Sequence, residues 1–297
     1  MKKKKYLYSG QALLIVLLSM AVVLVVVLSI LARSITDVSI SSQDEDSLRA
    51  FSAAEAGIER GLIIGSAVTD NIENAIYNVE VSSFAEGEKR FNYPNSLLSG
   101  ESATVWFVAH DEEENSICSE EKPCFTGKYL AVCWGKEGTV TDSSLTPALE
   151  LSVFYTSIPG DYSTIKIARA ALDPNSSRRG ENNFSANDEG NCQISSANYQ
   201  FIKIIDFDSL GIDPSVYQNQ NGLQFMKVRS IYNTSESNLF GVSVDFPEDS
   251  VLPSQGILID SSGSYGNANR KIEVFKNYKD VLDLFDFSVF TFGEITK

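Results

Sequence analysis

The chain has a single histidine, His110, and few basic residues: 24 Lys and Arg stand against 39 Asp and Glu in 297 residues, for a formal net charge of −15. One histidine excludes a multi-histidine zinc site and leaves one candidate for a histidine-based catalytic dyad. The acidic balance argues against a protein that binds nucleic acid by neutralising phosphates. We therefore expect no nucleic-acid partner.

Charged residues and helix breakers are both missing near the N-terminus. No charged residue occurs in residues 12–32, no proline precedes Pro94, and no glycine lies between Gln11 and Ala56. A helix over 12–32 is long enough to cross a hydrocarbon core of about 30 Å. A buried core helix is rarely apolar on every face, and the apolar part of a cleaved secretory signal spans only about 7–15 residues. The pattern predicts a transmembrane helix.

The charges that flank this run predict its orientation. Lys2–Lys5 precede it without any acidic residue, whereas Arg33 and then acidic residues follow it. By the positive-inside rule the N-terminus lies in the cytoplasm and residues 33–297 lie outside. We expect a single-pass protein of the cytoplasmic membrane with an extracytoplasmic head.

The helical pattern continues beyond the membrane segment. Apolar residues recur there every three or four positions, at Ile35, Val38, Leu48, Phe51, Ala54, Ile58 and Leu62. Small residues lie among them and would let a sheet or another helix approach the backbone closely: Ala53, Ala56, Gly57 and Gly61. The sequence predicts one helix over residues 11–64, roughly 80 Å long.

The leader and the helix together resemble a known family. The basic leader ending in Gly10, the uncharged run from Gln11 and the segment AFSAAEAGIERGL resemble type IV pilin-like proteins, specifically the PilX-like minor pilins, over about residues 9–62. This resemblance implies cleavage between Gly10 and Gln11 by a prepilin peptidase, with methylation of the new N-terminus. It also implies storage in membrane lipid, then assembly by a pilus platform into a filament held by the N-terminal helices of pilin subunits.

One departure from the family pattern narrows the role. Major pilins usually carry a glutamate at the fifth mature position, which is Ile15 here. A carboxylate in lipid is costly and is kept for a partner, so its absence removes an assembly contact. We therefore expect a minor subunit of a type IV pilus or a related secretion filament, with a role at the tip, in initiation or in adhesion.

The remaining residues predict a β-rich head. The expected organisation is a leader over 1–10, a long helix over 11–64 and a head over 65–297, an α+β fold with a mainly antiparallel sheet packed on the helix. Two polar insertions, 111–124 and 173–192, are expected to be loops. Short apolar or alternating runs predict strands at 77–84, 104–109, 129–134, 149–155, 165–172, 199–207, 223–232, 239–246, 256–259, 271–275 and 287–292.

The head contains all four cysteines, Cys118, Cys124, Cys133 and Cys192. An even number in an exported domain favours disulfides, and four cysteines allow three pairings. Cys118–Cys124 would close a short loop containing Pro123, and this choice leaves Cys133–Cys192. A four-cysteine zinc site is the rival interpretation, but the spacing lacks paired C-x-x-C motifs.

Motifs for catalysis or cofactor binding are weak. The acidic groupings at 111–114, at Asp206 and Asp208, and at 245–249 do not follow the calcium-loop pattern. His110 ends an expected strand and is interpreted as an exposed histidine, and no G-x-S-x-G, P-loop or dinucleotide fingerprint is present. The pair Arg178–Arg179 is too small to bind DNA. We expect no enzyme, no metal and no cofactor.

Two functional hypotheses from different classes follow. The first is the filament subunit described above. The alternative is an uncleaved, membrane-anchored extracytoplasmic binding domain, an adhesin or a sensor, which would retain Lys2–Lys5 and would not enter a filament. An enzyme is the third and weakest possibility.

Overall fold

The computed structural model describes residues 9–245 and 250–280, with side chains from residue 13 onward. Its first element is helix α1 (Ser9–Ile64), which has 56 residues and is therefore about 84 Å long. The helix is continuous because it contains no proline and its glycines lie only near its two ends. The predicted long N-terminal helix is confirmed.

The chain forms two compact units. The first comprises the residues up to Glu80 together with Asp260–Glu273, and the second comprises Val81–Ile259 together with the residues from Val274 onward. The sequence-based boundary at residue 64 marks the end of α1. The hairpin near residues 260–273 nevertheless belongs with the helix, because it returns to pair with a strand that follows α1 directly.

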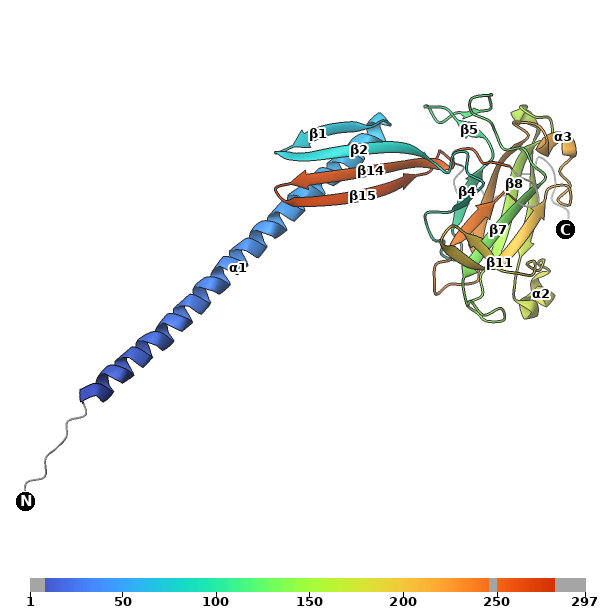
Figure 1. The fold of residues 1–297 in the computed structure, drawn as a ribbon. Helices are drawn as coiled ribbons and strands as arrows, with labels where there is room; N and C mark the ends of the chain where they lie inside the picture. The colour runs from blue at the N-terminus through green and yellow to red at the C-terminus, as the bar shows by residue number, and fades with distance from the viewer. Residues whose placement is uncertain (1–8, 246–249, 281–297) are drawn as a thin grey trace, which may run out of the picture. The chain divides into compact units, whose positions relative to one another are not determined.

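The first unit contains α1 and a four-stranded sheet. The sheet has the order β1 (Val68–Ile72), β2 (Ala75–Phe84), β14 (Gly256–Tyr265) and β15 (Ala268–Lys276), and Figure 1 shows these strands beside the C-terminal part of α1. Small residues make this packing possible. A Cβ atom added to Gly263 would lie 2.0 Å from the Ala50 carbonyl oxygen, and one added to Gly57 would lie 2.1 Å from Ser261 Oγ. The helix and the strand therefore approach to backbone contact.

The second unit is a two-sheet sandwich. One sheet has five strands in the order β10 (Cys192–Ile194), β11 (Ala197–Asp206), β7 (Tyr129–Lys136), β13 (Phe240–Ser243) and β3 (Arg90–Asn92). The other has four, β4 (Ser102–Trp106), β12 (Leu223–Ile231), β8 (Ala148–Thr156) and β9 (Ile165–Leu172). The pairings within both sheets are antiparallel, which confirms the α+β class.

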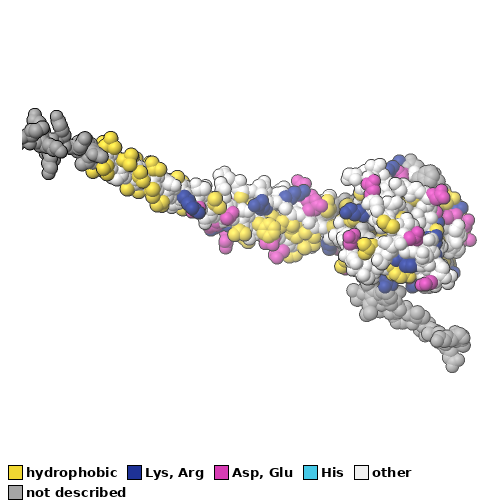
Figure 2. All heavy atoms as spheres, turned by 90° about the horizontal axis from the view of Figure 1, so that it is seen from below, with side chains coloured by type: hydrophobic (Ala, Val, Ile, Leu, Met, Phe, Trp, Pro, Cys, Tyr) yellow, Lys and Arg dark blue, Asp and Glu magenta, His cyan; other side chains and the backbone are white. Residues whose placement is uncertain are grey.

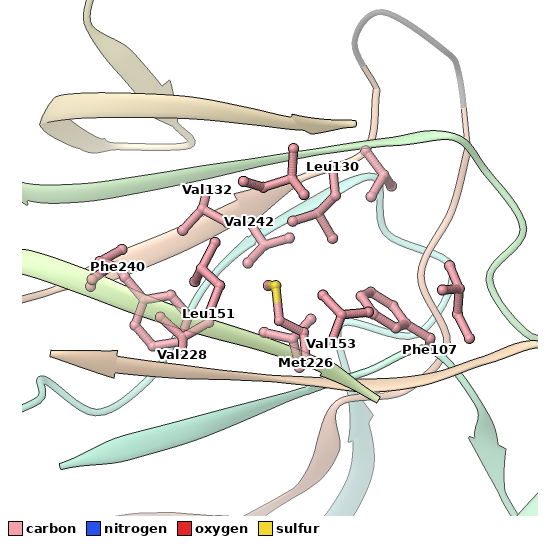
Figure 3. Packing of buried hydrophobic residues seen from close by; sticks show 14 of the residues in the cluster. Phe107, Leu130, Val132, Leu151, Val153, Met226, Val228, Phe240 and Val242 are labelled. Carbon is pink, nitrogen blue, oxygen red and sulfur yellow. The ribbon is translucent and has the colours of Figure 1, made fainter. Parts of the chain in front are cut away.

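A single apolar core fills the space between the two sheets. Figure 3 shows Val132 and Val242 of the five-stranded sheet facing Leu151, Val153 and Met226 of the four-stranded sheet. The core also holds one aromatic side chain from β7 and one from β11, Trp134 and Phe201, whose ring centroids lie 5.7 Å apart. Alternation along β8 is the physical cause: Leu149, Leu151 and Val153 are buried, and the residues between them face outward.

The two polar insertions are not loops throughout. Residues 111–124 contain β6 (Ser116–Ile117), which pairs with β5 (Ala109–His110). Residues 173–192 contain helix α2 (Ser176–Asn182). Two short elements complete the fold, the 3-10 helix η1 (Tyr162–Thr164) and helix α3 (Pro214–Tyr217). The strand predicted at 287–292 lies outside the described residues.

Candidate functional site

The N-terminal part of α1 is apolar and exposed on every face. All sixteen large apolar side chains from Leu13 to Leu31 are 48–68% exposed, and they form the yellow covering of the helix in Figure 2. The hydroxyl of Ser19 donates to the Val16 carbonyl oxygen at 2.8 Å, so this polar group is satisfied within the helix. The segment is long and apolar enough to span a membrane.

The C-terminal part of α1 packs on the sheet through its small residues. Its buried positions are Ala50, Ala53, Ala54, Gly57, Ile58 and Gly61. These follow a spacing of three and four, so they lie on one face of the helix. The prediction of close approach is confirmed for Ala53 and Gly57. Gly61 is buried, and Ala56 is only partly buried.

The large apolar residues of this part of the helix lie mostly outside the contact with the sheet. Of the apolar residues that recur every three or four positions, Ala54 and Ile58 are buried, whereas Leu48, Phe51 and Leu62 are exposed. The reason is steric: the sheet lies so close to the helix that only small side chains fit between them. Large apolar side chains are consequently left on the outside of α1, where they are available to other molecules.

The expected processing site is only partly described. The backbone of Gly10 and Gln11 lies in the first turn of α1, their side chains are outside the described residues, and so are residues 1–8. Ile15 is exposed on the apolar segment.

Both disulfides that the sequence analysis preferred are present. Cys118 and Cys124 are bonded with their Cα atoms 5.3 Å apart, and Cys133 and Cys192 are bonded with a Cα separation of 5.9 Å. The first disulfide closes a loop within the acidic insertion 111–124, and the second joins β7 to β10. Disulfides persist in oxidising compartments, so they fit an extracytoplasmic head.

His110 is buried, which corrects its interpretation as an exposed histidine. Its ring stacks on Tyr278 at a centroid distance of 4.0 Å and meets the Trp106 ring edge-on at 4.6 Å. Among the described residues, nothing hydrogen-bonds to its Nδ1 atom. Burial lowers the pKa of His110 to about 4, although the carboxylates of Glu114 and Asp111 act in the opposite direction. The ring is therefore a neutral packing group.

This burial predicts acid sensitivity. Between pH 6.5 and about 4 the unfolded chain binds a proton at His110 that the folded chain excludes. Stability is therefore complete above this window and falls as the pH decreases through it, by up to about 3 kcal/mol. Urea unfolding across the window measures the loss. The variant His110→Phe should remove this component while keeping the ring stack, and an unchanged pH dependence in that variant would contradict the prediction.

The acidic groupings are engaged within the chain. Asp111 accepts hydrogen bonds from the backbone of Glu113 and Asn115 at 2.9 and 2.8 Å. Lys128 lies 3.7 Å from Asp206 and 3.6 Å from Asp208. Asp245 accepts hydrogen bonds from Arg90 and Ser243. The other two acidic residues of the grouping at 245–249, Glu248 and Asp249, lie outside the described residues. In the described ranges, no three His, Cys, Asp or Glu side chains come together in a group suited to a metal ion.

A buried ion pair in the second insertion was not predicted from the sequence. Arg178 donates to both carboxylate oxygens of the fully buried Asp173, at 3.0 and 2.7 Å, and its guanidinium lies 4.2 Å from the centroid of the Tyr232 ring. Burial alone would raise the pKa of Asp173, but hydrogen bonds from Arg178, Asn175 and Asn182 outweigh it and hold the pKa below its ordinary value. The pair therefore organises the loop. One local feature of the sequence indicated an ordered element here: Asn175, which precedes two serines, is a residue type favoured at helix N-caps and caps α2.

A hollow of about 430 Å³ lies beside this loop and is lined by polar residues, among them Arg179, Asp188, Glu189 and Gln200. Several of these groups already have partners within the chain. Asp188 accepts from Lys203 Nζ at 2.6 Å, Gln200 accepts from the Gly138 amide at 2.8 Å, and Arg179 donates to the carbonyl oxygens of Asp173 and Pro174 at 2.9 Å. The exposed helix is accordingly the stronger candidate for a functional surface. No family model, curated protein or solved structure matches this chain.

Proposed function

We propose that this chain is a structural, pilin-like subunit that is stored in the membrane through residues 12–32 and assembled into a filament through α1. One observation carries the proposal: a continuous helix of 56 residues is apolar and exposed over its first part and packed on a sheet over its last part. A simple membrane anchor needs only about 20 residues. The extra length supports a role for the helix outside the membrane.

The energetics of the exposed segment support the same role. Moving a half-exposed Leu, Ile or Val from water to an apolar environment is worth about 1 kcal/mol or more. The sixteen side chains of the segment therefore contribute on the order of 20 kcal/mol, more than the whole stability of an ordinary domain. A segment of this kind leaves lipid only for another apolar environment, such as a bundle of identical or related helices.

Ile15 supports a minor rather than a repeating subunit. A subunit without a carboxylate at this position offers no negative charge to the N-terminal amine of its neighbour. Its assembly then depends on apolar contacts and on the large exposed side chains farther along α1, such as Leu48 and Phe51. Type IV pili and related secretion filaments both fit this description.

N-terminal processing tests the proposal. In cells with an active prepilin peptidase, we expect filament-associated chain to begin at Gln11, because the leader ends in a glycine whose lack of a side chain admits the peptidase. Removing the four lysines of the leader changes the charge from −15 to 20 − 39 = −19. N-terminal sequencing of the filament fraction measures the outcome.

The matched variants are Gly10→Leu and Ser9→Ala. Gly10→Leu should retain the leader and disappear from filaments, whereas Ser9→Ala should be processed normally. An intact Met1 in filaments, or normal processing of Gly10→Leu, would contradict the proposal. An intact leader together with absence from filaments would instead support the alternative, a membrane-anchored binding domain, for which the polar hollow beside α2 is the candidate ligand site.

A further inference from the structure

The polar hollow beside α2 lies in the second unit, and Figure 1 shows α2 at one end of the sandwich. Four segments line the hollow: the chain after β7 contributes Thr141, α2 contributes Arg179, the chain before β10 contributes Asn191, and β11 contributes Gln200. Its volume of about 430 Å³ falls within the range of about 300–1,000 Å³ that is usual for small-molecule pockets. The hollow is therefore large enough for a small ligand.

The walls of the hollow are held in place by contacts within the chain. Asp142, in the chain after β7, accepts hydrogen bonds from the backbone amide and the hydroxyl of Ser176 at 2.9 and 3.0 Å. The chain before β10 is paired with β11, because the Asp188 amide donates to the Ile202 carbonyl oxygen at 2.8 Å. It continues directly into Cys192, whose disulfide joins it to β7. Because these walls are already ordered, a ligand binds here at little ordering cost.

Several polar groups of the hollow are left for a ligand. Within residues 9–245 and 250–280, no group hydrogen-bonds to the Glu189 carboxylate or to the Asn191 side-chain amide, and both residues are exposed. In the same part of the chain, Gln200 accepts through Oε1, which leaves its Nε2 as a donor. Arg179 donates to two carbonyl oxygens through Nη1, which leaves Nε and Nη2. The hollow therefore presents both donors and acceptors.

The charges and the lack of apolar surface define the ligand class. The positive charge of Arg179 and the negative charge of Glu189 cancel, and Asp188 is balanced by Lys203 at 2.6 Å. A ligand with a net charge consequently gains no overall attraction. The aromatic residue of the lining, Phe201, is only 2% exposed, so a large apolar ligand gains little either. A hydroxyl group both donates and accepts, and therefore suits a mixture of donors and acceptors.

We propose that the polar hollow binds a neutral, hydroxyl-rich saccharide. Glu189 accepts hydrogen bonds from the saccharide hydroxyls, and Arg179, Asn191 and Gln200 donate hydrogen bonds to them. Binding at the hollow concerns the head alone. It rests neither on cleavage of the leader nor on entry into a filament, so failure of the proposed function would leave this proposal standing.

Amide NMR of the full-length chain in detergent micelles, labelled with ¹⁵N-glycine, tests the proposal. Gly190 lines the hollow, and Gly211 lies in a turn outside the lining. The variant Gly190→Ala identifies the Gly190 signal by its loss. The probes are the methyl glycosides of glucose, galactose, mannose and N-acetylglucosamine, each up to about 100 mM, which saturates even a site of millimolar Kd. At least one probe should shift the Gly190 signal saturably and leave Gly211 unchanged.

Three variants localise the binding. Glu189→Ala should raise the Kd roughly tenfold, the loss expected for one hydrogen bond to a charged group. Glu181→Ala makes the same change on α2 outside the lining and should leave the Kd unchanged. Ala186→Trp places a large side chain in the hollow and should abolish the shift. The other glycine signals report whether the sandwich stays folded, and if Ala186→Trp unfolds it, Asn191→Ala at an exposed side chain should weaken binding instead.

Four results would overturn the proposal. The first is the absence of a saturable Gly190 shift with every neutral probe. The second is an equal Kd in Glu189→Ala and Glu181→Ala, and the third is an unchanged shift in folded Ala186→Trp. The fourth is tighter binding of glucuronate than of the neutral glycosides, since this would show that the hollow selects a negative charge.

Discussion

Replacing Gly263 with alanine is expected to destabilise the packing of α1 on its sheet by about 3 kcal/mol or more, the upper part of the range for overpacked sites. The added Cβ would lie 2.0 Å from the Ala50 carbonyl oxygen and 2.5 Å from the Ala54 amide nitrogen. Both are backbone atoms of a helix and cannot move without displacing it. Hydrogen exchange of the β14 amides in the full-length chain measures the loss as a local opening free energy.

Two further glycines provide controls. Gly57→Ala should also destabilise the packing, but here the obstruction is the hydroxyl of Ser261, so Ser261→Ala should restore much of the loss. Gly180→Ala makes the same chemical change at a position with open space in α2 and should not destabilise the chain, since alanine is favoured over glycine in a helix by up to about 1 kcal/mol. Equal effects of Gly263→Ala and Gly180→Ala would contradict the backbone contact. So would rescue of Gly263→Ala by Ser261→Ala.

Removing the Cys133–Cys192 disulfide is expected to lower the free energy of unfolding of the sandwich by about 4 kcal/mol. The bond spans 59 residues, so its loss frees a large loop in the unfolded chain. Both half-cystines are buried beside Ile194 and Tyr199. The double variant Cys133→Ala with Cys192→Ala avoids burying a new hydroxyl, and denaturant unfolding measures its effect.

The second disulfide supplies the comparison. Cys118–Cys124 spans only 6 residues, and its removal by alanine at both positions should cost about 2 kcal/mol on the same chain-entropy argument. The expected order of the two variants is thus set by loop length. Equal losses, or a larger loss for the short loop, would show that local packing and not chain entropy dominates.

Local pattern was sufficient to predict most strands. The run 165–172 coincides with β9, and the alternation at 149–155 places Leu149, Leu151 and Val153 in the core as expected. Tyr155 departs from that alternation and is half-buried, because the register between β8 and β12 shifts beside Leu223. Strand β1 was not predicted, since Thr69, Asp70 and Asn71 give it no apolar alternation; pairing with β2 makes it a strand.

The exposed apolar part of α1 could be predicted from residue composition. The buried contacts of the head could not, because they depend on residues that are distant in the sequence. The exposed apolar segment follows from residues 12–32 alone, because a helix that is apolar on every face needs cover all round, and the described part of the chain leaves its large side chains exposed. The burial of His110 requires Tyr278, which lies far away in the sequence. The pair formed by Asp173 and Arg178 requires a loop of defined shape. Neither requirement produces a periodic pattern in the sequence.

By itself the sequence determined the long helix, its apolar half, the antiparallel β-rich head and the cysteines that are paired in it, because each depends on local residue type, on short-range periodicity or on the parity of a count. Only the tertiary structure decided which face of α1 meets the sheet, which strands pair across some 180 residues, and how the head divides into two compact units. These outcomes depend on the distance between backbones. At Gly263 that distance admits a hydrogen atom and no side chain, so the small residues of α1 face the sheet and the large ones remain available to partners.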